Sequence, residues 1–239
     1  MNLLVSDYDQ TLSMDDITIK LNIKKINEFR KNGNLFMLST GRDYQSIKKE
    51  IKKYNINYDY LSCSDGTSLY DTSDNIFLAK LDYEDLKKTE YLKLKYKLMI
   101  SFFDINSDES RLPEERIIEI KSPSYKKIMA EILPYFDKYL INSDYKCYYN
   151  CILIKPKGVN KSTTIAYLEK KLDLSKKDIF TIGDHDNDSE MIRDYNGFSM
   201  LWGTKKAKEY SLKNYLIMCG LLNDIEKQKE EFVKKLRFK

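Results

Sequence analysis

Carboxylate side chains follow two short apolar segments of this chain, one at its start and one late in the sequence. The first segment leads into Asp7 and Asp9, and the second leads into an acidic loop that holds Asp184 and Asp188. Two carboxylates about 4 Å apart repel by roughly 4 kcal/mol at an effective dielectric constant near 20, so acidic groups gathered at one site need a cation between them. Oxygen ligands of this kind suit a hard divalent cation, and such a site suits phosphoryl transfer.

Elements that would position these residues are visible in the pattern of apolar side chains. The sequence predicts strands over 2–6, 35–38 and 58–61 and helices over 16–32 and 43–54. The strand at 35–38 is apolar throughout, as expected for a parallel strand buried on both faces. The alternation of strand and helix predicts an α/β fold with a doubly wound parallel sheet. Ligands bind such a sheet outside the carboxyl ends of its strands, which is where the acidic residues fall.

The pattern changes in the middle of the chain, where we expect an inserted α+β domain at 81–154. Helices are predicted there over 83–95 and 124–139, with apolar or strand-like segments over 98–103, 116–121 and 145–154. Pro134 falls inside the second of these helices and should kink or end it. The catalytic core would then consist of 1–80 and 155–239. Its second part is predicted to contain helices over 162–172 and 221–236 and strands over 178–182 and 198–201.

Charge and composition exclude several classes of function. The chain has 239 residues, and its 41 Lys and Arg against 37 Asp and Glu leave a net charge of +4 with both signs mixed. A balance of this kind gives little support to binding of nucleic acid or of an anionic membrane. No apolar segment is long enough to span a bilayer and no basic leader precedes the first strand, so we expect a cytoplasmic protein. No feature of the sequence specifies an oligomeric state.

The single histidine, His185, narrows the chemistry further. A histidine-rich metal site is impossible, and no G-x-S-x-G segment offers a serine nucleophile. The four cysteines form no C-x-x-C pair, so we expect reduced, buried thiols and no zinc site. His185 lies inside the acidic loop, where we expect it to shape the loop or the rim of a pocket.

Four segments of the chain together resemble the motifs of the haloacid dehalogenase superfamily. Asp7-Tyr8-Asp9-Gln10-Thr11 is similar to its D-x-D-x-T motif, and Ser39-Thr40-Gly41-Arg42 is similar to the second motif. Lys161 resembles the third, and Gly183-Asp184 with Asn187-Asp188 resembles the fourth, G-D-x-x-N-D. The insertion between the third strand and Lys161 resembles the type IIB cap of the Cof-like hydrolases. All four motifs occur in the expected order across nearly the whole chain.

The resemblance implies a role for each acidic residue. Asp7 would attack phosphorus as the nucleophile and form an aspartyl-phosphate. Asp9 would protonate the leaving alkoxide and then activate water. Asp7, the backbone carbonyl of Asp9, and Asp184 would hold Mg²⁺, with Asp188 as a ligand or a close neighbour of the ligands.

The other motif residues would bind the phosphate. Thr40 and the amide of Gly41 would contact phosphate oxygens, and Lys161 would neutralise the phosphate and keep Asp7 ionised. Asn187 would orient Lys161 or the phosphate, and Arg42 would brace the loop or meet the substrate at the rim. Taken alone, Thr40-Gly41 is more often an ordinary turn between a strand and a helix, and Lys161 is equally compatible with a solvated helix position.

Two positions depart from the family pattern. Gln10 stands where glycine is frequent, which should restrict the backbone there. Ser64-Asp65-Gly66-Thr67 stands where Cof-like proteins often have Asn-Gly-Ala. Asp65 therefore adds negative charge near the entrance and should disfavour highly anionic substrates.

The leading hypothesis is a Mg²⁺-dependent phosphatase that hydrolyses a small phosphomonoester, such as a sugar phosphate or a related metabolite. A phosphomutase of the same superfamily is the first alternative, because Asp9 can activate a sugar hydroxyl as well as water. The second alternative is a phospho-receiver domain or a non-catalytic binding module. Receivers carry their phosphoacceptor after the third strand, where Asp65 is the only candidate, and they are roughly half this length.

Overall fold

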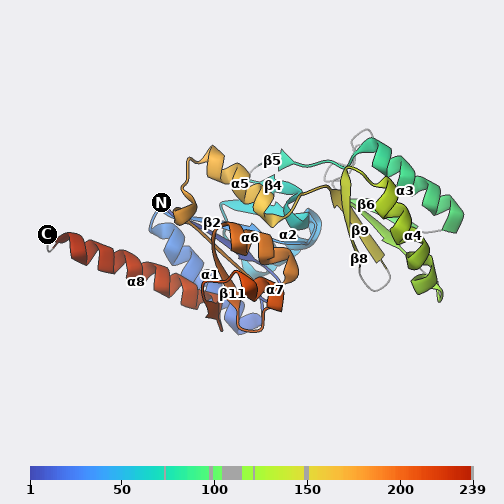
Figure 1. Cartoon of the computed structure of the whole chain (residues 1–239). Coiled ribbons are helices and arrows are strands. Elements are labelled where there is room, and N and C mark those ends of the chain that lie inside the picture. Colours follow the sequence, from blue (N-terminus) through green and yellow to red (C-terminus); the bar gives the residue numbers. More distant parts are fainter. Residues whose placement is uncertain (73, 97–98, 104–114, 121, 148–150, 238–239) are drawn as a thin grey trace.

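The structure is a computed structural model that describes residues 1–72, 74–96, 99–103, 115–120, 122–147 and 151–237. Figure 1 shows two sheets, each with helices of its own, and a long C-terminal helix, α8, that extends away from the larger part. The sequence predicts a polar loop over 104–114, between the segments 98–103 and 116–121, and this loop lies outside the described residues.

The larger sheet has eight strands in the order β12-β11-β10-β1-β2-β3-β4-β5. Its strands are β1 (Leu3–Asp7), β2 (Leu35–Ser39), β3 (Tyr60–Cys63), β4 (Ser68–Tyr70), β5 (Asn75–Leu78), β10 (Ile179–Gly183), β11 (Asn196–Met200) and β12 (Asn214–Tyr215). The six strands from β12 to β3 pair in parallel, which confirms the predicted fold class. β4 and β5 extend one edge in antiparallel pairing. They were missed from the sequence because strands of three and four residues are too short to show a period.

Helices cover both faces of this sheet. They are α1 (Asp16–Lys31), α2 (Tyr44–Tyr54), α5 (Lys161–Lys171), α6 (Ser189–Asp194), α7 (Lys205–Glu209) and α8 (Met218–Arg237). Leu4 of β1 packs in a buried cluster with side chains of α1, α2 and α8. Its neighbours Leu3 and Val5 pack in a second cluster with side chains of α5, α6 and α7. Successive side chains of a strand point to opposite faces, so β1 contributes to two cores and carries its last residue to the edge between them.

The smaller sheet has four antiparallel strands in the order β6-β7-β9-β8. They are β6 (Met99–Phe103), β7 (Glu115–Glu119), β8 (Ser143–Cys147) and β9 (Cys151–Pro156), and the helices are α3 (Tyr83–Tyr96) and α4 (Tyr125–Tyr139). Figure 1 shows α3 and α4 on the side of this sheet remote from the larger sheet. The described parts of these elements have a hydrophobic cluster of their own.

In the middle of the chain, α4 runs through Pro134 to Tyr139, so this proline does not end the helix. The strand-like segments predicted over 145–154 are confirmed as β8 and β9, which begin at Ser143 and Cys151. The division into a core and an insertion at 81–154 stays a prediction.

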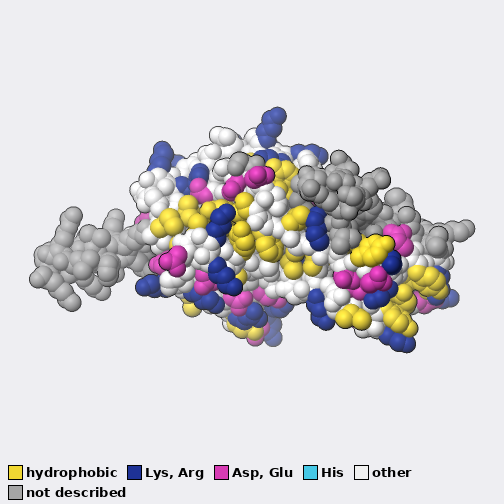
Figure 2. Space-filling view, turned by 90° about the horizontal axis from the view of Figure 1, so that it is seen from above, with side chains coloured by type: hydrophobic (Ala, Val, Ile, Leu, Met, Phe, Trp, Pro, Cys, Tyr) yellow, Lys and Arg dark blue, Asp and Glu magenta, His cyan; other side chains and the backbone are white. Residues whose placement is uncertain are grey.

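Surface charge is mixed in the way the composition suggested. Figure 2 shows basic, acidic and hydrophobic side chains interspersed over one face, without a continuous basic stripe there. Among the residues that the structure describes, none of the helices is both long enough and apolar enough to cross a membrane.

Candidate active site

Parallel pairing brings the two acidic segments to one edge of the larger sheet. β1 and β10 are neighbours, with Leu3 opposite Ile179 and Ser6 opposite Ile182. Asp7 is the last residue of β1, and Asp184 follows β10 directly. Because parallel strands end at the same edge, this register sets the two carboxylates side by side.

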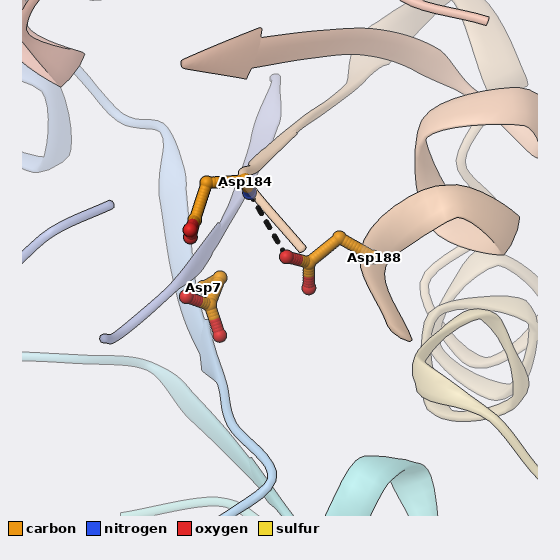
Figure 3. Close-up of side chains that lie close together, drawn as sticks. All are labelled: Asp7, Asp184 and Asp188. Atoms are coloured by element: carbon orange, nitrogen blue, oxygen red, sulfur yellow. Dashed lines mark hydrogen bonds between the residues drawn. The ribbon is translucent and has the colours of Figure 1, made fainter. Parts of the chain in front are cut away.

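Three buried carboxylates form the centre of the site. Oxygens of Asp7, Asp184 and Asp188 all lie within 4.8 Å of one another, and Figure 3 shows the three side chains converging. One oxygen of Asp188 accepts hydrogen bonds from the backbone N–H groups of Asp184 and His185, both at 2.9 Å. The Thr11 hydroxyl donates to Asp184 Oδ1 at 2.7 Å.

Gly183 is the position that allows Asp188 to approach. A Cβ added there would lie 2.4 Å from the Asp188 Cγ, closer than real contacts permit. The glycine of the G-D-x-x-N-D segment therefore has a steric reason: only a residue without a side chain lets the loop fold back over the end of β10.

Lys161 is buried within this carboxylate group. Its Nζ lies 2.5 Å from Asp7 Oδ1 and 2.6 Å from Asp188 Oδ1, and its side chain has no exposed surface. Lys161 is the first residue of α5, and the Asn160 side chain caps that helix by accepting from Ser162 N at 2.9 Å. The capped helix start thus fixes the lysine stem, and the ammonium group joins the first and fourth motifs.

Burial and charge shift the pKa values of these groups. Burial raises the pKa of Asp7 well above its ordinary value; Lys161 opposes this shift, and Asp188 reinforces it. Burial also raises the pKa of Asp184, against the hydrogen bond from Thr11. Burial alone would lower the pKa of Lys161, but Asp188 and Asp7 outweigh it and the net shift is upward. The lysine is therefore charged, and this one cation faces three carboxyl groups.

A divalent cation fits this donor set. Three buried carboxylates offer oxygen ligands, which Mg²⁺ prefers, and Lys161 supplies only one positive charge against them. A bound cation would offset the remaining charge and reverse the desolvation penalty on Asp7 and Asp184.

Asp9 lies apart from the buried group. Its side chain is 53% exposed, and its two oxygens accept from Arg42 Nε at 2.9 Å and Nη2 at 2.6 Å. The Arg42 guanidinium also lies 5.0 Å from the centre of the Tyr8 ring and 3.7 Å from a Glu50 oxygen. Arg42 thus holds the second acidic residue of the first motif, an ion pair that the sequence did not indicate.

The loop after β3 connects the phosphate-binding candidates. Asp65 is buried, and its Oδ1 accepts from Asn187 Nδ2 at 2.7 Å. Asn187 was expected to orient Lys161 or the phosphate. In the structure its side-chain amide bonds to Asp65. A Cβ on Gly41 would lie 3.1 Å from the same Asp65 oxygen, so this loop closes on the second motif. Thr40 is fully buried, and its hydroxyl accepts from Arg42 N at 3.1 Å.

A cavity of about 310 Å³ opens onto this constellation. Its walls come from the first, second and fourth motifs, from the loop after β3 and from β8 of the smaller sheet. The lining residues are Asp7, Asp9, Gln10, Gly41, Arg42, Asp65, Lys146, Asp184, His185 and Asn187. Sequence reasoning missed Lys146, which stands in no motif. His185 lies at the wall of the cavity, in keeping with its expected place.

Comparisons with known proteins agree with this geometry. The family model described as haloacid dehalogenase-like hydrolase matches residues 4–109 and 88–214. A protein of Buchnera aphidicola subsp. Baizongia pistaciae named "Putative phosphatase" is 27% identical over 221 residues, which cover 80% of this chain and 82% of that protein. A haloacid dehalogenase-like hydrolase of Bacteroides thetaiotaomicron superposes with a TM-score of 0.75 at 16% identity, covering 95% and 98% of the two chains. A solved subclass IIB sugar phosphatase superposes with a TM-score of 0.69 at 15% identity, covering 90% and 93%.

The structure is an α/β fold with acidic side chains at the ends of two neighbouring parallel strands and a second, smaller sheet beside them. The chain belongs to the haloacid dehalogenase-like hydrolase family. It is therefore a hydrolase of this family, which confirms the resemblance seen in the motifs.

Proposed function

We propose that this protein is a Mg²⁺-dependent phosphatase that hydrolyses a small phosphomonoester through an aspartyl-phosphate on Asp7. The observation that carries the proposal is the buried contact of Lys161 with both Asp7 and Asp188, beside Asp184. A lysine and three carboxylates in one water-poor site can hold a phosphoryl group and a metal ion next to one nucleophile.

Asp7 is the nucleophile in this proposal. Its carboxylate attacks phosphorus, the bond to the leaving oxygen breaks, and water then attacks the acyl phosphate to release inorganic phosphate. Mg²⁺, held by Asp7, Asp184, Asp188 and the backbone carbonyl of Asp9, would neutralise phosphoryl oxygens when bound. Lys161 favours the ionised form of Asp7 before the reaction and faces the phosphoryl charge during it.

Asp9 serves as the general acid and base. Its carboxyl protonates the leaving alkoxide and afterwards removes a proton from the attacking water. Both Asp7 and Asp9 line the catalytic cavity, which supports a nucleophile and a proton donor acting on one phosphate there. Arg42, through its two bonds to Asp9, sets the direction of that carboxyl.

The remaining motif residues bind the phosphate and the leaving group. The Thr40 hydroxyl and the Gly41 amide are proposed ligands of phosphate oxygens, with Lys161 as the counter-charge. Asn187, whose amide bonds to Asp65, would orient Lys161 or the phosphate. We propose that residues 81–154 form a cap that selects the leaving group. The solved subclass IIB sugar phosphatase with the same fold makes sugar phosphates the first substrates to try.

Release of inorganic phosphate from a panel of phosphorylated metabolites, with and without Mg²⁺, tests the proposal. We expect Mg²⁺-dependent release by the natural protein and a loss of at least about 10³-fold in Asp7→Asn. Glu209→Gln, at an exposed position of α7, is the control and should keep full activity. Absence of metal-dependent release, or full activity in Asp7→Asn, would contradict the proposal.

Product analysis separates the two remaining alternatives. A hexose monophosphate converted to its isomer without phosphate release would indicate a phosphomutase. A stable phosphate on Asp65 after treatment with acetyl phosphate, detected by intact mass, would indicate a receiver. Burial of the Asp65 side chain and its bond to Asn187 do not favour phosphorylation at that residue.

A further inference from the structure

Lys146 of β8 lies on the open face of the smaller sheet. Its neighbour Tyr145 points the other way: the Tyr145 ring lies 5.5 Å from Phe136 of α4, and its hydroxyl bonds to Asp137. Side chains alternate along a strand, so Lys146 projects from the face opposite α4. In Figure 1 the face opposite α3 and α4 is the one turned toward the larger sheet.

Lys155 of β9 shares this face. The residues on either side of Leu153, Ile152 and Ile154, are buried in the cluster that packs against α4, so Lys155 alternates away from it. In the register of the sheet, Lys155 pairs with Asp144, two residues before Lys146 on β8. Two lysines therefore stand on the surface that faces the catalytic edge.

Two cavities meet at Lys146. The first is the catalytic cavity of about 310 Å³, and the second is a cavity of about 350 Å³ between the two sheets. Asp65, Lys146 and Asn187 line both of them. A phosphomonoester whose phosphate lies beside Asp7 would extend past these three side chains into the second cavity. Lys146 is thus a wall residue along the path of the leaving group.

The carboxylates around the second cavity are mostly held by other groups. Asp65 accepts from Asn187, and Asp144 accepts from the backbone N–H of Gly158 at 2.7 Å. Glu190 lies 3.6 Å from Lys206. The exposed carboxylate of Asp186 also lines this cavity and would compete with a substrate anion for the lysines there. Asp65 lines both cavities, and its Oδ1 accepts a hydrogen bond from Asn187, so that amide meets part of its charge.

We propose that Lys146 is a specificity-determining residue that binds a second anionic group on the substrate, a carboxylate or another phosphate beyond the one transferred. The inference rests on the proposed phosphatase function and names the charge class of its substrate. A lysine carries three donors on a flexible stem, so it can keep a protein partner and still contact an anion in the cavity.

Matched substrates test the inference with the full-length protein and Mg²⁺. Glycerol 3-phosphate and 3-phosphoglycerate differ in one end group, a hydroxymethyl against a carboxylate. Glucose 6-phosphate and glucose 1,6-bisphosphate supply the corresponding pair for a second phosphate. We expect the natural protein to favour the member with two anionic groups by about tenfold or more in kcat/KM, which corresponds to about 1.4 kcal/mol.

Lys146→Met should abolish that preference through KM. We expect KM for the two-anion substrate to rise about tenfold with kcat nearly unchanged, and KM for its matched partner to change less than twofold. Lys146→Glu should reverse the preference. Lys127→Met, at an exposed position on α4, is the control and should leave kcat and KM unchanged for all four substrates.

The outcomes distinguish the inference from the function on which it rests. Phosphate release that Lys146→Met leaves unchanged for every substrate, or reduces equally for both members of a pair, would overturn the role of Lys146 alone. The proposed phosphatase would stand. Release of phosphate from no substrate by the natural protein would overturn both. A preference that follows Lys155→Met and not Lys146→Met would overturn the assignment to Lys146 and place the anion contact on β9.

Discussion

Lys161 shows how one buried cation makes a cluster of carboxylates compatible with a folded chain. Its ammonium group touches Asp7 and Asp188, and all three side chains are almost completely shielded from solvent. Removing one partner from a buried ion pair typically destabilises a protein by about 3–5 kcal/mol, because the other charge stays buried and unpaired. The single lysine balances one carboxylate, so the site gains from a further cation.

The raised pKa values of Asp7 and Asp184 predict how metal binding depends on pH. Each group has a folded pKa above its unfolded value of 3.8, so between these values the metal-free folded state binds protons that the unfolded state has released. Without metal, stability therefore falls as pH rises through that window. Mg²⁺ competes with those protons, so we expect it to raise the melting temperature more at pH 8 than at pH 5.

Thermal melts with and without Mg²⁺ at the two pH values measure this effect. Asp184→Asn removes one proposed ligand and should shrink the Mg²⁺-dependent increase at pH 8, whereas Glu209→Gln should keep it. Equal increases at pH 5 and pH 8, or an undiminished increase in Asp184→Asn, would contradict the assignment of these carboxylates to the metal.

Gln10 carries backbone strain within the first motif. Its φ is +60°, in the left-handed region, and its carbonyl oxygen accepts from Trp202 Nε1 at 3.1 Å. A residue with a side chain loses roughly 1 kcal/mol in this conformation relative to glycine. Part of the gain from glycine is offset by the greater freedom of the unfolded chain. We expect Gln10→Gly to raise the free energy of unfolding by up to about 1 kcal/mol in urea titrations.

A glycine placed in a helix provides the contrast for that experiment. Gln45→Gly lies in the first turn of α2 and should lower the free energy of unfolding by up to about 1 kcal/mol. A decrease in Gln10→Gly of the same size as in Gln45→Gly would show that the Gln10 side chain stabilises the loop more than its backbone strain opposes it.

At the scale of elements, the middle part of the chain depends on a buried carboxylate that connects a helix to a distant turn. Asp85 of α3 accepts from the backbone N–H of Asn142 at 2.9 Å and of Ile141 at 3.3 Å, and from Lys88 Nζ at 2.9 Å. Burial would raise the pKa of Asp85, but these bonds outweigh it and hold the pKa below its usual value. The stability it contributes is therefore present above about pH 4 and is lost as pH falls further.

Asp85→Asn tests this connection between α3 and the turn before β8. The amide keeps the shape but loses the charge and turns its NH2 toward one of the two backbone N–H groups, so we expect a loss of about 2–3 kcal/mol in the free energy of unfolding at pH 7. Glu84→Gln changes an exposed neighbour that pairs with Lys87 and should change stability by less than about 0.5 kcal/mol. Equal effects of the two variants would contradict the role of Asp85.

On the scale of the whole molecule, the described residues form separate hydrophobic cores. Two clusters flank the larger sheet, and a third lies between the smaller sheet and its helices. The single tryptophan, Trp202, follows β11 in the larger part. Its fluorescence therefore reports on the larger sheet, whereas far-ultraviolet circular dichroism reports on both parts.

Phe136→Ala should weaken the smaller part selectively. Phe136 is fully buried in the cluster of α3, α4 and the smaller sheet, and truncating such a side chain costs about 3–5 kcal/mol. In urea, we expect circular dichroism to show an early transition that Trp202 fluorescence does not follow. Leu38→Ala, in a core of the larger sheet, should shift the fluorescence transition. Coincident shifts of both probes in Phe136→Ala would show that the two parts unfold as one.

Much of this arrangement could be predicted from local pattern. The apolar run of β1, the amphipathic α1 with Gly33 just after its end, and the acidic ends of β1 and β10 all express periodicity and spacing that neighbouring residues reveal. The boundaries of these elements lie within a few residues of their predicted positions. β4, β5 and β12 escaped prediction because they are short and depend on a partner strand for their structure.

The amino-acid sequence by itself determined which side chains end each strand and in what order the motifs occur, because these are properties of adjacent residues. Only the tertiary structure decided which of those side chains touch. The pairing of Arg42 with Asp9, of Asn187 with Asp65, and the approach of Lys146 to the catalytic cavity join residues far apart in the chain. Such contacts depend on sheet register and on how the two sheets face each other, and neither is encoded in any one stretch of sequence.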